Sequence, residues 1–265
     1  MQTAFTPSHR GGTGSPMVLL HGFADTWRTW ELVLPALERR HDVLAVTLAG
    51  HAGGPPLDDP LTDDTLADAV ERAMDEAGFE LAHLVGNSLG GSLALQLAAR
   101  GRARTVVALA PAGGWASDDR SYVELLRMQR AAIRMLRGTA PQADALVATP
   151  RGRRRVTQLL TVRDEHIPAP LLAHLMLGGA ACSGAEALID HALAAGWPFE
   201  PERIACPVRI VWGTEDLMLP WPSAAARFRA ALPHADWVQL DGVGHCPQLD
   251  VPAEAADLIL GFTGG

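Results

Sequence analysis

The chain has 265 residues, of which 48% are hydrophobic and 20% charged, and its formal net charge is −8. This length and composition fit one large α/β domain, or one domain with an insert, that buries a substantial core. The acidic balance argues against a nucleic-acid partner, and because all 22 basic residues are arginine, chemistry that needs a lysine is excluded.

The cysteine and histidine spacing points away from disulfides and metals. Three scattered cysteines, at positions 182, 206 and 246, suit a reducing compartment and show no disulfide framework. No metal-ligand spacing is present among the Cys and His residues. Residues 1–14 lack a signal-peptide pattern, and no apolar run is long enough to span a bilayer. We therefore expect a cytoplasmic protein with neither a membrane nor a metal site.

Short apolar runs alternate with helix-like patterns in the first 110 residues. The predicted strands are 17–20, 42–46, 81–85 and 105–110, and the predicted helices are 27–37, 65–77 and 88–100. The segment before residue 17 is short for two full strands, so we expect the first edge strand to be reduced or missing. Continuous apolar strands separated by helices predict a mostly parallel central sheet with helices on both faces.

The alternation stops between residues 114 and 199. This stretch is helical in pattern, rich in arginine and without a convincing strand. We predict that 114–199 is an inserted helical cap, or lid, on a core made of 1–113 and 200–265. Strand patterns return at 208–212 and 237–240, and helical patterns at 222–232 and 253–261.

The most informative motif is GNSLG at 86–90, which joins the strand 81–85 to the following helix. In that context, G-x-S-x-G is typical of a nucleophile elbow. Its two glycines allow tight backbone packing, and the turn presents a strained Ser88 at the C-terminal end of the strand. The alternative is an ordinary turn with a serine N-cap.

A serine nucleophile needs a general base, and the base needs an orienting acid. The strand 208–212 leads to Glu215 and Asp216, and the strand 237–240 leads to Asp241 and His245. We predict a catalytic triad in the chain order Ser88, Asp216, His245. Glu215 and Asp241 remain alternative acids, and turn formation or helix capping is the alternative role for all three carboxylates.

Acyl transfer also needs donors for the developing oxyanion. The backbone N–H of Leu89, directly after the nucleophile, is one candidate. The N–H of Phe23 is the other, because Gly22 lets the loop after strand 17–20 approach closely. We expect His21 to be a buried, hydrogen-bonded structural residue and not a second base.

These motifs together resemble the α/β-hydrolase fold superfamily. The resemblance rests on HGFAD at 21–25, GNSLGG at 86–91, GTED at 213–216 and GHCPQLD at 244–250, and it spans the chain except the cap. It implies a mostly parallel sheet with an inserted helical cap, and a Ser–His–Asp hydrolase with no cofactor and an acyl-enzyme intermediate. The branches with the most similar motifs hold small esterases, cofactor-free haloperoxidase-like enzymes and carbon–carbon bond hydrolases. Ser88 argues against haloalkane dehalogenases and epoxide hydrolases, whose nucleophile is aspartate.

We expect a largely apolar pocket between Ser88 and the cap that takes a small-molecule ester. The predicted lining residues are Phe23, Leu89, Trp115, Leu217 and Met218; the alternative is that most of them are ordinary core residues. Four arginines recur at helical spacing, which favours a solvated helix face over attraction of a carboxylate-bearing substrate; they are Arg127, Arg130, Arg134 and Arg137.

The sequence therefore predicts a carboxylic ester hydrolase. A carbon–carbon bond hydrolase of diketone acids with the same triad is the alternative that a cap arginine in the pocket would favour. A low-turnover ligand-binding protein on the same fold is a further alternative, because a fold alone does not fix a function. A homodimer is compatible with the sequence, which leaves the oligomeric state open.

Overall fold

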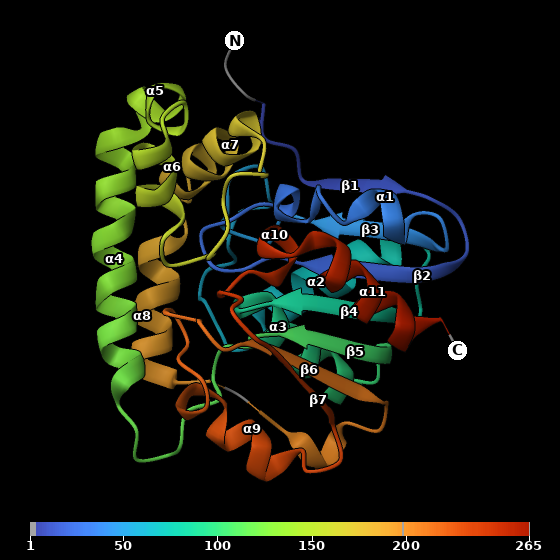
Figure 1. The fold of residues 1–265 in the computed structure, drawn as a ribbon. Coiled ribbons are helices and arrows are strands. Elements are labelled where there is room, and N and C mark those ends of the chain that lie inside the picture. The colour runs from blue at the N-terminus through green and yellow to red at the C-terminus, as the bar shows by residue number, and fades with distance from the viewer. Residues whose placement is uncertain (1–3, 198, 265) are drawn as a thin grey trace.

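The computed structural model describes residues 4–197 and 199–264. Within this part of the chain, seven strands form one sheet in the order β1-β3-β2-β4-β5-β6-β7 (Figure 1). β1 is antiparallel to β3, and every other neighbouring pair is parallel. The strands are β1 (Ser8–Gly11), β2 (Ser15–Leu20), β3 (His41–Val46), β4 (Ala82–Asn87), β5 (Ala103–Leu109), β6 (Val208–Gly213) and β7 (Asp236–Leu240). The mostly parallel α/β architecture is confirmed, and the edge strand is reduced to four residues but present.

Helices cover both faces of the sheet because the strands are apolar on both sides. Val18 and Leu20 of β2 pack into one core cluster, and Met17 and Leu19 pack into the other. α2 (Thr65–Glu76), α3 (Leu89–Ala99) and α9 (Ala226–Ala231) contribute to the first cluster. α1 (Leu34–Leu37) and α11 (Pro252–Thr263) contribute to the second, and α10 (Pro247–Asp250) lies against α11.

Two predicted helices are shorter than expected. The segment predicted as one helix over 27–37 forms a 3-10 turn, η1 (Trp27–Trp30), and the single-turn α1. Pro35 lies in the first turn of α1, and its missing N–H suits a helix start and not the middle of a longer helix. The predicted helix 222–232 likewise divides into η4 (Ser223–Ala225) and α9.

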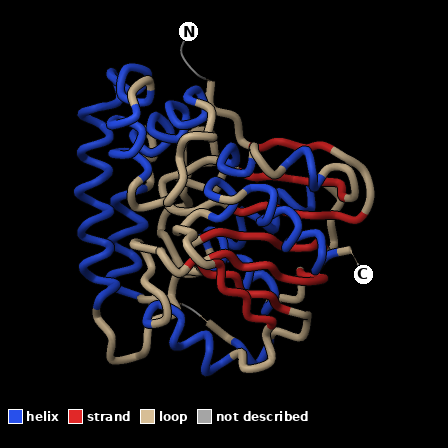
Figure 2. Tube along the Cα trace, in the orientation of Figure 1, coloured by secondary structure: helices blue, strands red, loops and turns tan. Residues whose placement is uncertain are grey.

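The insertion between β5 and β6 is helical, as predicted. Its helices are α4 (Ser121–Thr139), η2 (Ala140–Gln142), α5 (Ala143–Val147), α6 (Pro150–Thr157), α7 (Ala169–Ala180) and α8 (Ala185–Ala195), and η3 (Pro201–Arg203) leads back to β6. These helices stand beside the end of the sheet (Figure 1), and loops fill the space between them and the strands (Figure 2). This arrangement is consistent with a cap over the carboxyl ends of the parallel strands, where ligands bind in open α/β sheets.

The arginines of α4 either contact other helices of the insertion or lie toward solvent. Arg130 pairs with Glu186 and Asp190 of α8, and Arg134 lies 3.8 Å from Glu186. Arg127 pairs with Glu124 of its own helix, and the Arg137 guanidinium donates to backbone carbonyls at the end of α7 and beyond it. The four arginines at helical spacing therefore form a face of α4 that is ion-paired with α8 and partly exposed to solvent.

In the described residues, no single helix is long and apolar enough to cross a membrane; α7 and α8 reach that length and apolarity only as a pair bent by 66°. The same residues contain no group of three or more His, Cys, Asp or Glu side chains placed to hold a metal ion.

Candidate active site

The turn at Ser88 has the backbone of a nucleophile elbow. Ser88 lies between β4 and α3 with φ at 56° and ψ at −117°, a conformation that non-glycine residues rarely adopt. A Cβ added at Gly86 would lie 2.1 Å from the carbonyl oxygen of Gly90, and one added at Gly90 would lie 2.1 Å from that of Leu20. Both glycines are therefore required by close backbone contacts, as the motif predicts.

Replacing one of these glycines is expected to destabilise the fold. Gly86→Ala forces backbone apart at the elbow, and we expect a loss of about 3 kcal/mol or more in the free energy of unfolding. Gly261→Ala is the matched control, because nothing lies within 4 Å of its added Cβ in α11 and alanine favours helix. Urea denaturation of both variants measures the difference; equal stabilities would contradict the tight elbow.

Asp216 and His245 form a buried pair at the ends of β6 and β7. The His245 Nδ1 lies 2.8 Å from Asp216 Oδ2, and the aspartate side chain is fully buried. The other carboxylate oxygen, Oδ1, accepts the backbone N–H groups of Met218 and Leu219 at 2.8 and 2.7 Å. These bonds hold the carboxylate in place and leave the Nε2 of the imidazole free to serve the nucleophile.

The alternative acids lie elsewhere. Glu215 and Asp241 are both exposed, whereas Asp216 is buried against the imidazole. Of the three carboxylates near these strand ends, the geometry therefore selects Asp216 as the partner of His245.

The His245 loop is fixed from three directions. The Asn87 side-chain amide donates to the His245 carbonyl at 3.0 Å. The N–H of Gly244 donates to the buried Asp250 carboxylate at 2.7 Å, and the N–H of Cys246 donates to the Leu160 carbonyl at 2.8 Å. The elbow, the C-terminal segment and the insertion thus position the imidazole together, and Ser88 and His245 line one cavity.

The loop after β2 brings a second backbone donor to the serine. A Cβ added at Gly22 would lie 3.4 Å from the Ser88 Cβ, which is van der Waals contact, so the loop passes directly beside the serine. Within the described chain, the N–H groups of Phe23 and Leu89 have no hydrogen-bond acceptor, and both residues lie next to Ser88 around a common cavity. They are thus available to a developing oxyanion.

His21 is buried and structural, as predicted. Its Nε2 accepts the Leu48 N–H at 2.9 Å, so Nδ1 carries the proton and donates to the Gly22 carbonyl at 2.7 Å. Burial, together with neighbouring His51, lowers the pKa of His21 well below its usual range and keeps the ring neutral. Because the Gly22 carbonyl and the Phe23 N–H belong to one planar peptide, His21 also fixes the direction of that N–H.

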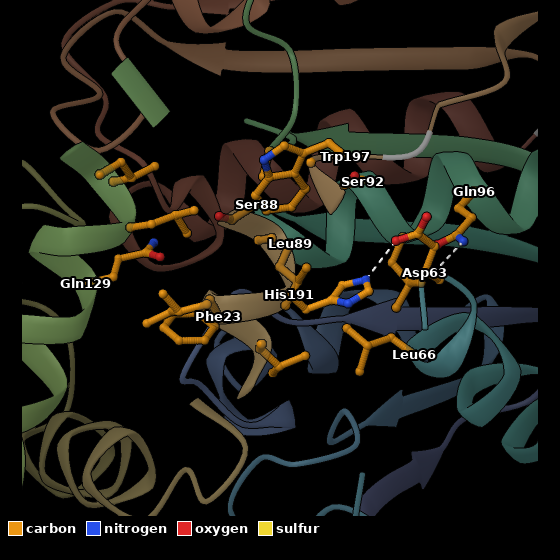
Figure 3. A pocket seen from close by; sticks show the side chains of 18 of the residues that line it. Phe23, Asp63, Leu66, Ser88, Leu89, Ser92, Gln96, Gln129, His191 and Trp197 are labelled. Carbon is orange, nitrogen blue, oxygen red and sulfur yellow. Dashed lines mark hydrogen bonds and ion pairs between the residues drawn. The ribbon is translucent and has the colours of Figure 1, made fainter. Parts of the chain in front are cut away.

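Two cavities meet at Ser88. The larger has a volume of about 450 Å³ and is walled mainly by apolar side chains of the insertion, with Met218 and His245 on the sheet side. The smaller has a volume of about 100 Å³ and is lined by Leu89 of the elbow and by residues of α2, α3 and α8 (Figure 3). Phe23 lines both cavities, Leu89 lines the smaller one and Met218 lines the larger one. The positions of these three residues agree with their predicted lining roles.

Comparison with known proteins identifies the family. The model of the alpha/beta hydrolase family matches residues 17–258. The chain belongs to the alpha/beta hydrolase family. It is 32% identical over 168 residues to the epoxide hydrolase EphH of Mycobacterium tuberculosis, a match that covers 63% of this chain and 78% of the relative.

Solved structures share the fold of this hydrolase. The carboxylesterase CesB from Bacillus subtilis superposes with a TM-score of 0.70 at 22% identity, covering 100% of this chain and 90% of that one. The meta-cleavage product hydrolase CumD from Pseudomonas fluorescens IP01 gives 0.70 at 21% identity, covering 97% and 93%. At these identities the likeness concerns the fold alone.

Two predicted lining residues of the hydrolase lie outside both cavities. Trp115 is 6% exposed and packs in the sheet core, with its ring centroid 5.8 Å from that of Tyr122. Leu217 is 60% exposed. The turn around the Asp216 carboxylate directs Met218 and Leu219 inward and leaves Leu217 outside, so the predictions for Trp115 and Leu217 are wrong.

Two further titratable groups lie beside the site. Asp25 lines the larger cavity, and burial raises the pKa of its carboxyl to about 7. Burial, reinforced by the carboxylates of Asp25, Asp216 and Asp250, raises the pKa of the Cys246 thiol well above its usual range. Cys246 therefore stays a thiol and donates to the Asn87 side chain, at 3.4 Å.

Asp25 is expected to make stability depend on pH. The pKa of this carboxyl is about 7 in the folded protein and 3.8 in an unperturbed aspartate, which represents the unfolded chain. Between these two pH values the unfolded chain releases the proton while the folded protein keeps it. The folded state therefore loses stability as the pH rises from about 4 to 7. Relative to wild type, the free energy of unfolding of Asp25→Asn should rise by up to about 4 kcal/mol as the pH increases from 4 to 7. Above pH 8 this difference should stay constant. Urea unfolding across this range measures the gain; parallel pH curves would contradict it.

Sequence reasoning missed four residues that the structure brings to the site. Asn87 and Asp250 position the histidine loop, while Asp25 and Arg155 line the larger cavity. Asp25, Asn87 and Asp250 stand inside the motifs at 21–25, 86–90 and 244–250, and their place in these motifs was a signal that could have identified them. Arg155 lies in an arginine-rich run of the insertion, where spacing alone does not show which side chain faces the cavity.

Proposed function

We propose that this alpha/beta hydrolase cleaves carboxylic esters of small to medium apolar substrates. The observation that carries the proposal is the buried Asp216–His245 pair beside a strained Ser88, under a mainly apolar cavity. That set supplies a nucleophile, a base with a fixed tautomer and a place for an uncharged acyl compound.

In the proposed reaction, Ser88 Oγ attacks the ester carbonyl carbon while His245 Nε2 takes its proton. The N–H groups of Phe23 and Leu89 hold the resulting oxyanion, and Asp216 stabilises the imidazolium. The C–O bond to the alcohol then breaks, and the imidazolium protonates the departing oxygen. Water, deprotonated by His245, then attacks the acyl-enzyme carbonyl; the bond between the acyl carbon and Ser88 Oγ breaks, the imidazolium returns the proton to Oγ, and the acid is released.

The serine also argues against epoxide opening, the activity in the name of the relative EphH. An aspartate that opens an epoxide forms an ester, which water can hydrolyse at its carbonyl. A serine would form an ether, which has no carbonyl for water to attack, and the enzyme would not turn over. Acyl chemistry is the reaction class in which Ser88 is regenerated.

Carbon–carbon bond hydrolysis of diketone acids is the second candidate, because Arg155 of α6 lines the larger cavity. A guanidinium there offers a partner for a substrate carboxylate. The four arginines of α4 do not line either cavity. Arg155 is exposed, however, whereas the rest of the wall is largely apolar, so we rank the uncharged ester first.

Steady-state turnover separates the two candidates. Wild type is assayed with p-nitrophenyl acetate to octanoate and with a vinylogous diketone acid, next to Arg155→Gln. Ester hydrolysis that is unchanged in Arg155→Gln supports the proposal. Turnover of the diketone acid alone, lowered about 10- to 100-fold in kcat/KM by Arg155→Gln, would replace it with the second candidate. No turnover of any of these substrates would contradict both.

A further inference from the structure

The two cavities, here called the large and the small chamber, share Ser88, Phe23 and Gln129. Ser88 therefore lies at their junction. Figure 3 shows the small chamber with Ser88 and Phe23 toward one end and a contact between His191 and Asp63 toward the other. When a substrate is bound at the serine, the groups on the two sides of its scissile bond can therefore lie in different chambers.

The proposed chemistry decides which part of an ester enters which chamber. The departing alcohol oxygen takes its proton from His245 Nε2, so the alcohol must lie within hydrogen-bond reach of that ring. His245 lines the large chamber and is not part of the wall of the small one. With the oxyanion held at Phe23 and Leu89, the acyl chain is directed into the small chamber, which Leu89 lines.

The volumes then set the sizes of the two parts. An apolar cavity of about 150 Å³ is enough to bind benzene, and the small chamber, at about 100 Å³, is below that size. The large chamber, at about 450 Å³, falls within the range of about 300–1,000 Å³ typical of small-molecule sites. We therefore expect an aromatic acyl group to fit the small chamber less well than an aromatic alcohol fits the large one.

The far end of the small chamber is held by a polar contact. His191 Nε2 of α8 lies 2.7 Å from Asp63 Oδ1, and the Gln96 side chain donates to the Asp63 carbonyl at 2.9 Å. Leu66 and Trp197 form apolar walls between this end and the serine. Extending an acyl chain beyond the apolar part would bring methylene groups against His191 and Asp63, which is unfavourable.

We propose that the substrate is an ester of a short acyl group, of about two to four carbons, with a bulky apolar alcohol. The acyl group occupies the small chamber and the alcohol the large one. This inference rests on the proposed ester hydrolysis and adds the substrate class to it.

The test uses two isomeric esters, benzyl acetate and methyl phenylacetate, which have the same atoms and primary alcohol leaving groups. We expect kcat/KM for benzyl acetate to exceed that for methyl phenylacetate by about 10-fold or more. An equal or reversed ratio would overturn the chamber assignment and leave ester hydrolysis standing. If wild type hydrolyses neither these nor the p-nitrophenyl esters, the proposed function fails, and the assignment fails with it.

Two variants test the chambers separately, one variant for each chamber. Leu188→Phe narrows the small chamber and should lower kcat/KM for benzyl butyrate more than for benzyl acetate. Ala132→Phe narrows the large chamber and should lower kcat/KM for benzyl acetate more than for ethyl acetate. The reverse pattern would overturn the assignment; the isomer pair, measured on wild type, decides it if either variant does not fold.

Discussion

Ser88→Ala is expected to abolish ester hydrolysis while leaving the fold intact. Without the hydroxyl there is no acyl-enzyme, and we expect kcat to fall by about 10⁴-fold or more. Alanine fits the space of serine and removes one oxygen from a site that has no side-chain hydrogen bond at its helix cap. The measurement is kcat on p-nitrophenyl acetate, with circular dichroism and urea denaturation to confirm folding.

The matched control for this variant is Ser223→Ala. The Ser223 hydroxyl is exposed on η4 and donates to the Pro220 carbonyl at 3.0 Å, away from both cavities. It should retain kcat within about 2-fold, as surface changes usually do. Comparable activity of Ser88→Ala and Ser223→Ala would show that another group carries the reaction.

Asp216→Asn is the second large expected effect. The amide keeps an oxygen for the N–H groups of Met218 and Leu219, but it no longer accepts the His245 Nδ1 proton as a carboxylate and cannot stabilise the imidazolium. We expect kcat to fall by about 10³- to 10⁴-fold with a small change in stability. Steady-state kinetics between pH 6 and 9 measure the loss.

Glu215→Gln and Asp241→Asn test the alternative acids directly. Both side chains are exposed, so each variant should keep kcat within about 2-fold of wild type. A large loss in either of them, together with an active Asp216→Asn, would transfer the acid role away from Asp216.

The positions of the three proposed triad residues could be predicted from sequence because the fold does most of the positioning. Parallel strands end at one edge of the sheet, so a motif after β4 and residues after β6 and β7 must converge there. The elbow adds a second constraint, since its glycines are needed wherever backbone atoms approach within van der Waals distance. Chain order and strand ends therefore sufficed to place Ser88, Asp216 and His245.

Side-chain direction in loops could not be predicted in the same way. Whether Leu217 or Met218 faces the cavity depends on hydrogen bonds of the Asp216 carboxylate, which hydrophobicity does not report. Trp115 follows β5 closely, but its packing against Tyr122 takes it into the core. An apolar residue near a strand end is thus compatible with core, cavity or solvent.

The arrangement of the insertion depends on contacts between distant residues. α4 and α8 are joined by the pairing of Arg130 with Asp190, sixty positions further along the chain, and Arg153 of α6 reaches carbonyls before α7. Helical periodicity predicts each helix separately but not which helices pair. For that reason the chambers, and the place of Arg155 in the large one, became visible only in the structure.

In the proposed reaction Ser88 is an activated nucleophile, and intact mass spectrometry after treatment with a fluorophosphonate probe, which phosphonylates such a serine, tests this role most directly. We predict one adduct on the wild-type chain, mapped by peptide analysis to Ser88, and no adduct on Ser88→Ala under the same conditions. An unlabelled wild-type chain, or an adduct that persists in Ser88→Ala, would contradict the assignment of Ser88 as the nucleophile.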